Sequence, residues 1–104
     1  MHANPAELPA KRGWKSYSIE PIAAAAVVRY PSRGRSLAIE YGSLDAVPAY
    51  WGLWMNTGWA GHRCFAIEPT TGRFDEIDRA VKDGSAGRVA ASGKVAWTVQ
   101  WTVR

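Results

Sequence analysis

The chain has 104 residues, of which 47% are hydrophobic and 21% charged, and its formal net charge is +4 at pH 7. This length allows one domain, and the hydrophobic content is too high for a disordered chain. The basic residues are spread along the sequence rather than gathered in one run, so we expect no nucleic-acid partner.

The N-terminal segment indicates neither secretion nor membrane insertion. Residues 1–13, with Pro5, Pro9 and Gly13, are expected to form an irregular lead-in. They lack the apolar run of a secretory signal, and no segment has the length of a membrane span. The single cysteine, Cys64, is expected to be a small buried residue in a reducing compartment. We therefore expect a cytoplasmic protein with no membrane partner.

The first half of the chain predicts three strands. Residues 14–20 alternate between apolar and polar side chains, as a half-buried strand does. Residues 24–30 are rich in β-branched side chains towards their end, although the alanines at their start also suit a helix. The segment 31–35 contains proline and glycine and is expected to turn the chain into a third strand, 36–41, which forms a hairpin with the second.

The middle of the chain predicts two more strands. Residues 49–56 are apolar on both faces, which indicates a strand buried from both sides. A glycine-containing loop, 56–61, then leads into a strand over 62–68. Because strand side chains alternate, Glu68 shares one face of this strand with small side chains such as that of Ala66.

The last part of the chain predicts one helix and a closing strand. The helix covers 75–84, with Asp75 as its N-cap and Gly84 as its stop. Residues 94–104 alternate as an amphipathic strand, whose apolar face contains Val95, Trp97, Val99, Trp101 and Val103. Together these elements predict a mainly β protein with antiparallel sheets and one short helix near 75–83.

Glu68 is the candidate functional carboxylate. It stands at a strand end above the small side chain of Ala66, which leaves the kind of space that a substrate cleft requires. Pro69 follows and is expected to end the strand, because proline has no backbone donor. The alternative is structural: a glutamate at a strand end is usually solvated or paired with an arginine, and Arg63 or Arg73 suits that role.

The aromatic residues around Glu68 suggest a carbohydrate ligand. Aromatic faces bind the C–H surface of a sugar while polar groups at the rim form hydrogen bonds. Trp54 shares a strand face with Asn56 and suits a cleft wall, whereas Trp59 suits either a cleft or the core. His62 has a side chain that titrates near neutrality, although a lone histidine in a loop is more often simply exposed. The other face of the 49–56 strand contains Trp51, Leu53 and Met55, which we expect to pack in the core.

The segment "YWGLWMNTGWAGHRCFAIEPTTG" (50–72), followed by an acidic helix and the terminal "SGKVAWTVQWTV", resembles the C-terminal end of the aldose 1-epimerase (galactose mutarotase-like) family. The resemblance covers residues 14–104 and rests on the order of an apolar strand, a glycine loop, a strand that ends in glutamate and a final amphipathic strand. It implies a partial β-supersandwich, with 14–104 as the C-terminal part of a mutarotase-like β-sandwich domain.

The resemblance also implies a mechanism. In the family, the glutamate at the end of this strand takes the proton from the anomeric hydroxyl while a histidine protonates the ring oxygen, and the opened sugar closes as the other anomer. Glu68 matches the position of that base. The family's acid histidine lies upstream of the segment that this chain resembles, and neither His2 nor His62 matches it. The resemblance thus allows an isomerase, a non-catalytic sugar-binding module or an inactive fragment.

The sequence therefore predicts a sugar site around Glu68, with no cofactor and no metal ligands. The ligand is an aldose or a sugar phosphate, and the candidate substrate-binding residues are Trp54, Asn56, Trp59, His62 and Arg73. A sandwich strand normally has neighbours on both sides, so a partial sandwich exposes sheet edges. We expect this chain to form a homodimer through such edges or to aggregate.

Overall fold

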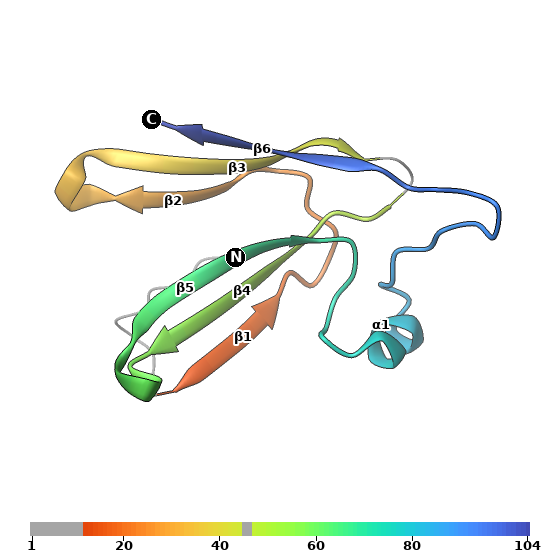
Figure 1. Cartoon of the computed structure of the whole chain (residues 1–104), viewed down its shortest axis with the longest axis horizontal. Helices are drawn as coiled ribbons and strands as arrows, with labels where there is room; N and C mark the ends of the chain where they lie inside the picture. The colour runs from red at the N-terminus through yellow and green to blue at the C-terminus, as the bar shows by residue number, and fades with distance from the viewer. Residues whose placement is uncertain (1–11, 45–46) are drawn as a thin grey trace.

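A computed structural model describes residues 12–44 and 47–104, which form two three-stranded antiparallel sheets and one short helix (Figure 1). The mainly β fold with antiparallel sheets and one helix is therefore confirmed. The elements are β1 (Gly13–Tyr17), β2 (Ala26–Tyr30), η2 (Pro31–Arg33), β3 (Arg35–Leu44), β4 (Tyr50–Thr57), η3 (Trp59–Gly61), β5 (Arg63–Thr70), α1 (Ile77–Asp83) and β6 (Trp97–Val103). Most of the expected lead-in, residues 1–11, lies outside the described residues.

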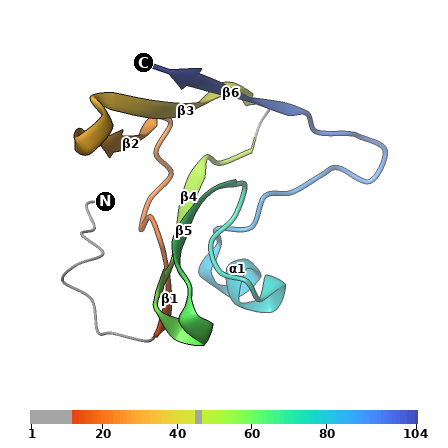
Figure 2. The same ribbon diagram turned by 60° about the vertical axis from the view of Figure 1, so that its left-hand side comes forward.

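The six strands divide into two layers that are joined at one end. Sheet A has the order β1-β4-β5 and sheet B the order β2-β3-β6. The two sheets approach each other near the end of β3 and diverge towards the β2–β3 hairpin, while α1 lies beside sheet A (Figures 1 and 2). Tyr41 of β3 connects the two sheets, because the centroid of its ring lies 5.1 Å from the ring centroid of Trp51 in β4. Its hydroxyl lies 2.7 and 2.9 Å from the carbonyl oxygens of Tyr50 and Thr70, at the ends of two strands of sheet A.

The core lies at this junction and along β4. β4 is largely buried, although Leu53 and Trp54 are partly exposed. β1 and β5 pair with its two edges, and Tyr41 of sheet B packs against Trp51 on one of its faces. Met55 is 2% exposed and Trp51 is 7% exposed. The other buried hydrophobic residues are Ala38, Ile39, Ala49, Tyr50 and Ala80.

The predicted hairpin between the second and third strands is confirmed. β2 pairs antiparallel with β3, and the turn between them is the 3-10 helix η2 followed by Gly34. Gly34 has φ 58°, a left-handed conformation that glycine adopts without steric cost. β3 is longer than expected and continues past a bulge between Tyr41 and Ser43.

Pro69 does not end its strand, contrary to expectation. β5 continues to Thr70, and Pro69 lies opposite Trp51 in the register with β4. The backbone carbonyl and N–H of Trp51 are used by Ser18, on the β1 side of β4. The Trp51–Pro69 pair is thus a non-hydrogen-bonded one, and the N–H that Pro69 lacks would point to the open edge of the sheet.

The helix is shorter than predicted and begins differently. Glu76 is the N-cap and makes no side-chain cap hydrogen bond, so the prediction of Asp75 as N-cap is wrong. The predicted stop is confirmed, because Gly84 ends the helix with φ 76°. Ala80 is buried, whereas Ile77 is 72% exposed. In the described part of the chain, no helix has the length and apolar character that crossing a membrane requires.

Candidate functional site

Glu68 stands on one face of sheet A with small residues beside it. The register of β4 and β5 pairs Glu68 with Gly52 and Trp54 with Ala66. Directly opposed residues of antiparallel strands point to the same face, so Glu68, Gly52, Ala66 and Trp54 share one face of sheet A. The side chains of Glu68 and Tyr17 fill the space over Gly52, and the indole Nε1 of Trp54 lies near Gly13, on the β1 side of the sheet. Glu68 and Trp54 are diagonal neighbours on the two strands, and such residues have their Cα atoms about 7–8 Å apart. The side chain of Glu68 is 38% exposed and is therefore within reach of a ligand.

The partner of Glu68 is Lys15, which the sequence analysis did not identify. Lys15 belongs to β1, at the opposite edge of sheet A, and its Nζ lies 2.9 Å from Glu68 Oε2. The lysine reaches the carboxylate across Gly52 in the central strand. A Cβ atom at Gly52 would lie 3.2 Å from Glu68 Oε2 and 3.3 Å from Tyr17 Cε1, so this glycine provides the space for the ion pair.

The two arginines considered as partners of Glu68 lie elsewhere. Arg63 belongs to the other face of β5, because it is separated from Glu68 by an odd number of positions in the strand. Arg73 lies beyond the end of β5, and its Nη1 is 3.3 Å from Asp83 Oδ2. Its guanidinium lies 4.9 Å from the ring centroid of Phe74.

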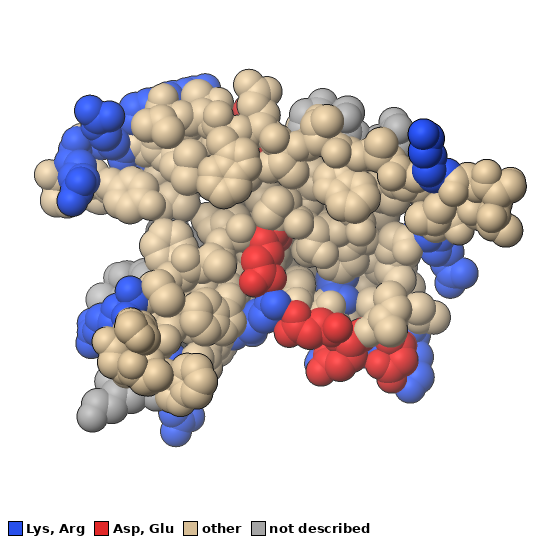
Figure 3. All heavy atoms as spheres, in the orientation of Figure 1, with Lys and Arg blue, Asp and Glu red and all other residues tan. Residues whose placement is uncertain are grey.

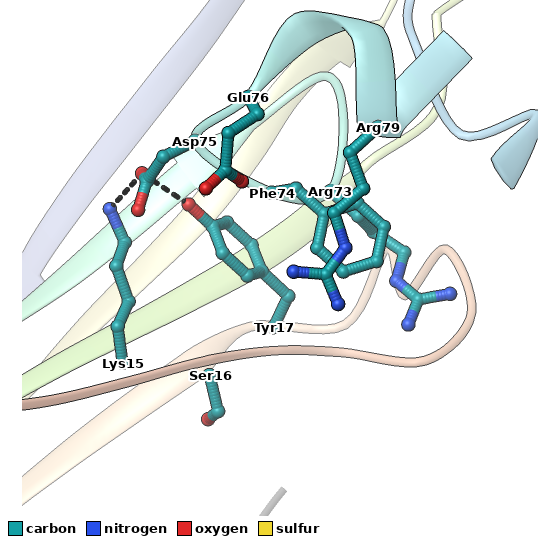
Figure 4. Close-up of a pocket in the computed structure, with 8 residues that line it drawn as sticks. All are labelled: Lys15, Ser16, Tyr17, Arg73, Phe74, Asp75, Glu76 and Arg79. Atoms are coloured by element: carbon teal, nitrogen blue, oxygen red, sulfur yellow. Dashed lines mark hydrogen bonds and ion pairs between the residues drawn. The ribbon is translucent and has the colours of Figure 1, made fainter. Parts of the chain in front are cut away.

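Lys15 also joins Glu68 to a polar cluster before α1. Figure 4 shows the Lys15, Tyr17 and Asp75 side chains of this cluster. Lys15 Nζ lies 2.5 Å from Asp75 Oδ1, and the Tyr17 hydroxyl donates to the same oxygen at 2.7 Å. The cluster borders an open cavity of about 250 Å³, whose lining also includes Arg73, Phe74, Glu76 and Arg79. Figure 3 shows that acidic side chains gather on this side of the molecule around α1.

The contacts of this cluster hold its charges in place. The hydrogen bonds from Lys15 and then Tyr17 keep the pKa of Asp75 below its usual range. The hydrogen bonds to Asp75 and then to Glu68 raise the pKa of Lys15 well above its usual range. Burial, followed by the hydrogen bond to Asp75, raises the pKa of Tyr17. At neutral pH, Lys15 is therefore a firmly protonated donor and a poor source of protons.

Phe74 supports the other side of the cavity in an unusual backbone conformation. Its φ is 72°, a left-handed value that is uncommon for a residue with a large side chain. The Arg79 guanidinium lies 3.9 Å from the centroid of the Phe74 ring, and the Tyr17 ring is 6.1 Å away. These contacts fix the aromatic ring next to the Lys15–Asp75 pair.

The remaining candidate residues lie at the far end of sheet A. Asn56 is 7% exposed, and its amide group organises the η3 turn: Nδ2 donates to the Trp59 carbonyl, and Oδ1 accepts from the backbone N–H groups of Gly58 and Trp59. Trp59 is 62% exposed. His62 is exposed and precedes Glu68 by six positions along an extended chain, a separation of about 20 Å. Of the candidates, Trp54 lies beside Glu68, and Arg73 lies near Lys15.

Cys64 is exposed, so the expectation of a small buried cysteine is wrong. It occupies the outward-facing end of the edge strand β5, opposite Asn56. Within residues 12–44 and 47–104, no three His, Cys, Asp or Glu side chains gather as a metal-binding group.

The substitution Asp75→Asn is expected to destabilise the fold at neutral pH and to lose that effect in acid. The folded-state pKa of Asp75 is lowered, so its contribution is present above the unfolded value of about 3.9 and disappears as the pH falls through the folded value. Thermal unfolding from pH 7 to pH 2 measures this. Asp78→Asn is the control, because Asp78 makes only an exposed contact of 3.8 Å with Lys82. If the two variants lost the same amount of thermal stability at pH 7, a stabilising role for the Asp75 contacts would be contradicted.

No known family, curated protein or solved structure matches the chain. What the site can do follows from its own groups. The Glu68 carboxylate can accept a proton or a hydrogen bond, Lys15 can donate hydrogen bonds, and Trp54 offers an apolar ring. That combination suits a neutral, polyhydroxylated ligand.

Proposed function

We propose that the chain is a cytoplasmic, carbohydrate-processing protein of the aldose 1-epimerase type, with Glu68 as the proton acceptor. The observation that carries the proposal is that Glu68, whose side chain is 38% exposed, shares a face of sheet A with Trp54 as its diagonal neighbour. A pyranose stacked against the indole ring has its hydroxyl groups at the rim, where the carboxylate and Lys15 lie.

The proposed reaction needs one proton acceptor and one proton donor. Glu68 takes the proton from the anomeric hydroxyl. The bond between the anomeric carbon and the ring oxygen then breaks, and the ring oxygen receives a proton from a solvent water molecule. Rotation of the resulting aldehyde and ring closure on its other face give the second anomer. On ring closure the ring oxygen gives that proton back to solvent, and Glu68 returns its proton to the new anomeric hydroxyl. Lys15 orients the carboxylate from 2.9 Å and, by donating to a sugar hydroxyl, positions the substrate.

A second candidate, a non-catalytic sugar-binding module, is favoured by the absence of a suitable acid beside Glu68 in the described residues. His62 is about 20 Å away along the strand, and the raised pKa of Lys15 makes it a weak proton donor. Each general acid or base contributes roughly 100- to 10,000-fold to a rate. A base without its acid therefore binds the sugar and accelerates its anomerisation only modestly.

We further propose that residues 14–104 correspond to the C-terminal part of a mutarotase-like β-sandwich. Two features support this correspondence: two antiparallel sheets in two layers, and a closing strand whose apolar face is partly uncovered. Trp101 and Val103 are 63% and 67% exposed, although they share their face with Ile39, which is 2% exposed. An additional β layer over this end would cover them.

Polarimetry on freshly dissolved α-glucose, α-galactose and their 6-phosphates tests the proposed function. The optical rotation is expected to reach its equilibrium value faster with the protein than in buffer. Saturable quenching of tryptophan fluorescence without faster mutarotation would support the binding module instead. Neither effect with any of these sugars would contradict the assignment of a sugar site.

A further inference from the structure

β6 is an edge strand with an unusually uncharged sequence. It pairs with β3 on one side, and in the described part of the chain no strand pairs with its other side (Figures 1 and 2). Its seven residues, "WTVQWTV", contain no charge, no proline and no glycine. Three of its large side chains are exposed: Trp97 by 47%, Trp101 by 63% and Val103 by 67%.

The other edge strands carry features that oppose pairing with another chain. Charged residues and proline on an edge strand are common means of preventing such pairing. β1 contains Lys15, β2 is five residues long and contains Arg29, and β5 contains Arg63 and Pro69. Among the strands that the structure describes, only β6 combines an open edge with an uncharged, β-forming sequence.

The backbone of β6 is oriented for pairing at its open edge. Arg104 exchanges two hydrogen bonds with Ser36 of β3, with N–O distances of 2.8 and 2.9 Å. Because backbone direction alternates along a strand, Gln100 also turns its N–H and carbonyl towards β3. Val99, Trp101 and Val103 therefore direct their N–H and carbonyl groups to the open edge.

We propose that β6 is the interface of a two-fold symmetric homodimer, in which the β6 strands of two copies pair antiparallel about Gln100. The two copies of sheet B then form one continuous sheet of six strands. In this register each Trp faces a Val of the other copy, each Thr faces a Thr, and Gln100 faces Gln100. Aromatic residues opposite β-branched residues, and threonines opposite threonines, are favourable cross-strand pairs. The same patch is used by both subunits, as two-fold symmetry requires.

The two copies of Arg104, the first charged residue after β6, do not repel each other in this arrangement. Antiparallel pairing about Gln100 places the two copies of Arg104 at opposite ends of the interface, about 27 Å apart along the strands. That separation exceeds the Debye length of about 8 Å at physiological ionic strength. The dimer also leaves Glu68 accessible, because Glu68 belongs to sheet A. The inference therefore does not depend on the proposed sugar site.

A charge-swap experiment at Gln100 tests the interface. Gln100 is exposed and lies opposite Glu40 of β3, so thermal unfolding first checks that Gln100→Lys and Gln100→Glu remain folded. Sedimentation velocity at tens of micromolar is expected to give a dimer for the unmodified chain. Each variant alone places two like charges opposite each other, about 4.5 Å apart between Cα atoms. The dissociation constant of the dimer is therefore expected to rise at least about tenfold. An equimolar mixture of the two variants is expected to restore the dimer.

A cysteine trap gives an independent readout. A non-hydrogen-bonded antiparallel pair has a Cα separation that a disulfide can bridge. In a Cys64→Ser background, Gln100→Cys is expected to form a covalent dimer on mild oxidation, whereas Cys64→Ser alone, which has no thiol, is not. A monomeric unmodified chain, polydisperse aggregates, or dimers that neither charge variant weakens would overturn the proposal.

Discussion

Replacing Trp51 by alanine is expected to lower the free energy of unfolding by about 3–5 kcal/mol, the range for a buried tryptophan. Trp51 is 7% exposed and lies where the two sheets meet. Its indole Nε1–H lies within hydrogen-bond distance of two carbonyl oxygens in the segment between β1 and β2, those of Ile22 at 3.0 Å and Ala24 at 3.2 Å. The substitution therefore removes contacts with Tyr41 and this segment together, and it leaves a cavity at the junction.

Urea unfolding followed by far-ultraviolet circular dichroism measures this effect. Trp59→Ala is the matched control, because Trp59 is 62% exposed, and its loss is expected to cost less than about 1 kcal/mol. A domain of this size is stable by about 5–15 kcal/mol, so Trp51→Ala is expected to be partly unfolded at 37 °C if the chain lies near the lower limit. Similar unfolding midpoints for the two alanine variants would contradict the assignment of Trp51 to the junction.

Replacing Glu68 by glutamine is expected to return mutarotation to the rate in buffer, because a general base contributes roughly 100- to 10,000-fold and Glu68 is the only base proposed. The amide has nearly the shape of the carboxylate and can still accept a hydrogen bond from Lys15, but it cannot take a proton from a sugar hydroxyl. Lys15 keeps its contact with Asp75, so the fold is expected to remain intact. The loss is therefore expected in the rate and not in the unfolding transition.

The control for this change is Glu20→Gln, since Glu20 is exposed and lies outside the strands. Polarimetry gives the rate for the unmodified chain and both variants, and thermal unfolding confirms that each is folded. Equal rates for the unmodified chain and Glu68→Gln would remove the carboxylate from the mechanism and leave the binding module as the better interpretation.

Local sequence signals were sufficient for most of the elements. The Pro- and Gly-containing turn before β3 and the glycine that ends α1 act through conformational preferences of a few adjacent residues. Alternation of apolar and polar residues located β6, and a run that is apolar on both faces located β4. The boundaries of the strands were predicted less accurately. β5 continues through Pro69, because the backbone nitrogen of Pro69 is turned away from its pairing partner Trp51 in β4.

The partner of Glu68 was not predictable from local patterns. Lys15 lies on another strand, and its contact with Asp75 joins residues that are 60 positions apart. Such contacts depend on the order of strands in the sheet and on Gly52 leaving room in the central strand. The prediction of Asp75 as the helix N-cap was wrong for the same reason. Its carboxylate accepts hydrogen bonds from Lys15 and Tyr17 of β1 instead of capping the helix.

The degree to which the apolar face of β6 is buried could also not be predicted from the sequence pattern. The face was correctly located, but its exposure is set by the divergence of the two sheets towards the hairpin end (Figure 1). Periodicity identifies which residues share a face, whereas the neighbouring layer determines whether that face is covered.

The central claim is that a sugar binds against the face of sheet A that contains Glu68 and Trp54. A fluorescence titration with an aldose tests it most directly, comparing the unmodified chain with Trp54→Phe and Trp59→Phe. We expect saturable quenching in the unmodified chain and in Trp59→Phe, and its loss in Trp54→Phe, because Trp54 shares a face of sheet A with Glu68 as its diagonal neighbour. Quenching that survives in Trp54→Phe, or that disappears only in Trp59→Phe, would contradict the account.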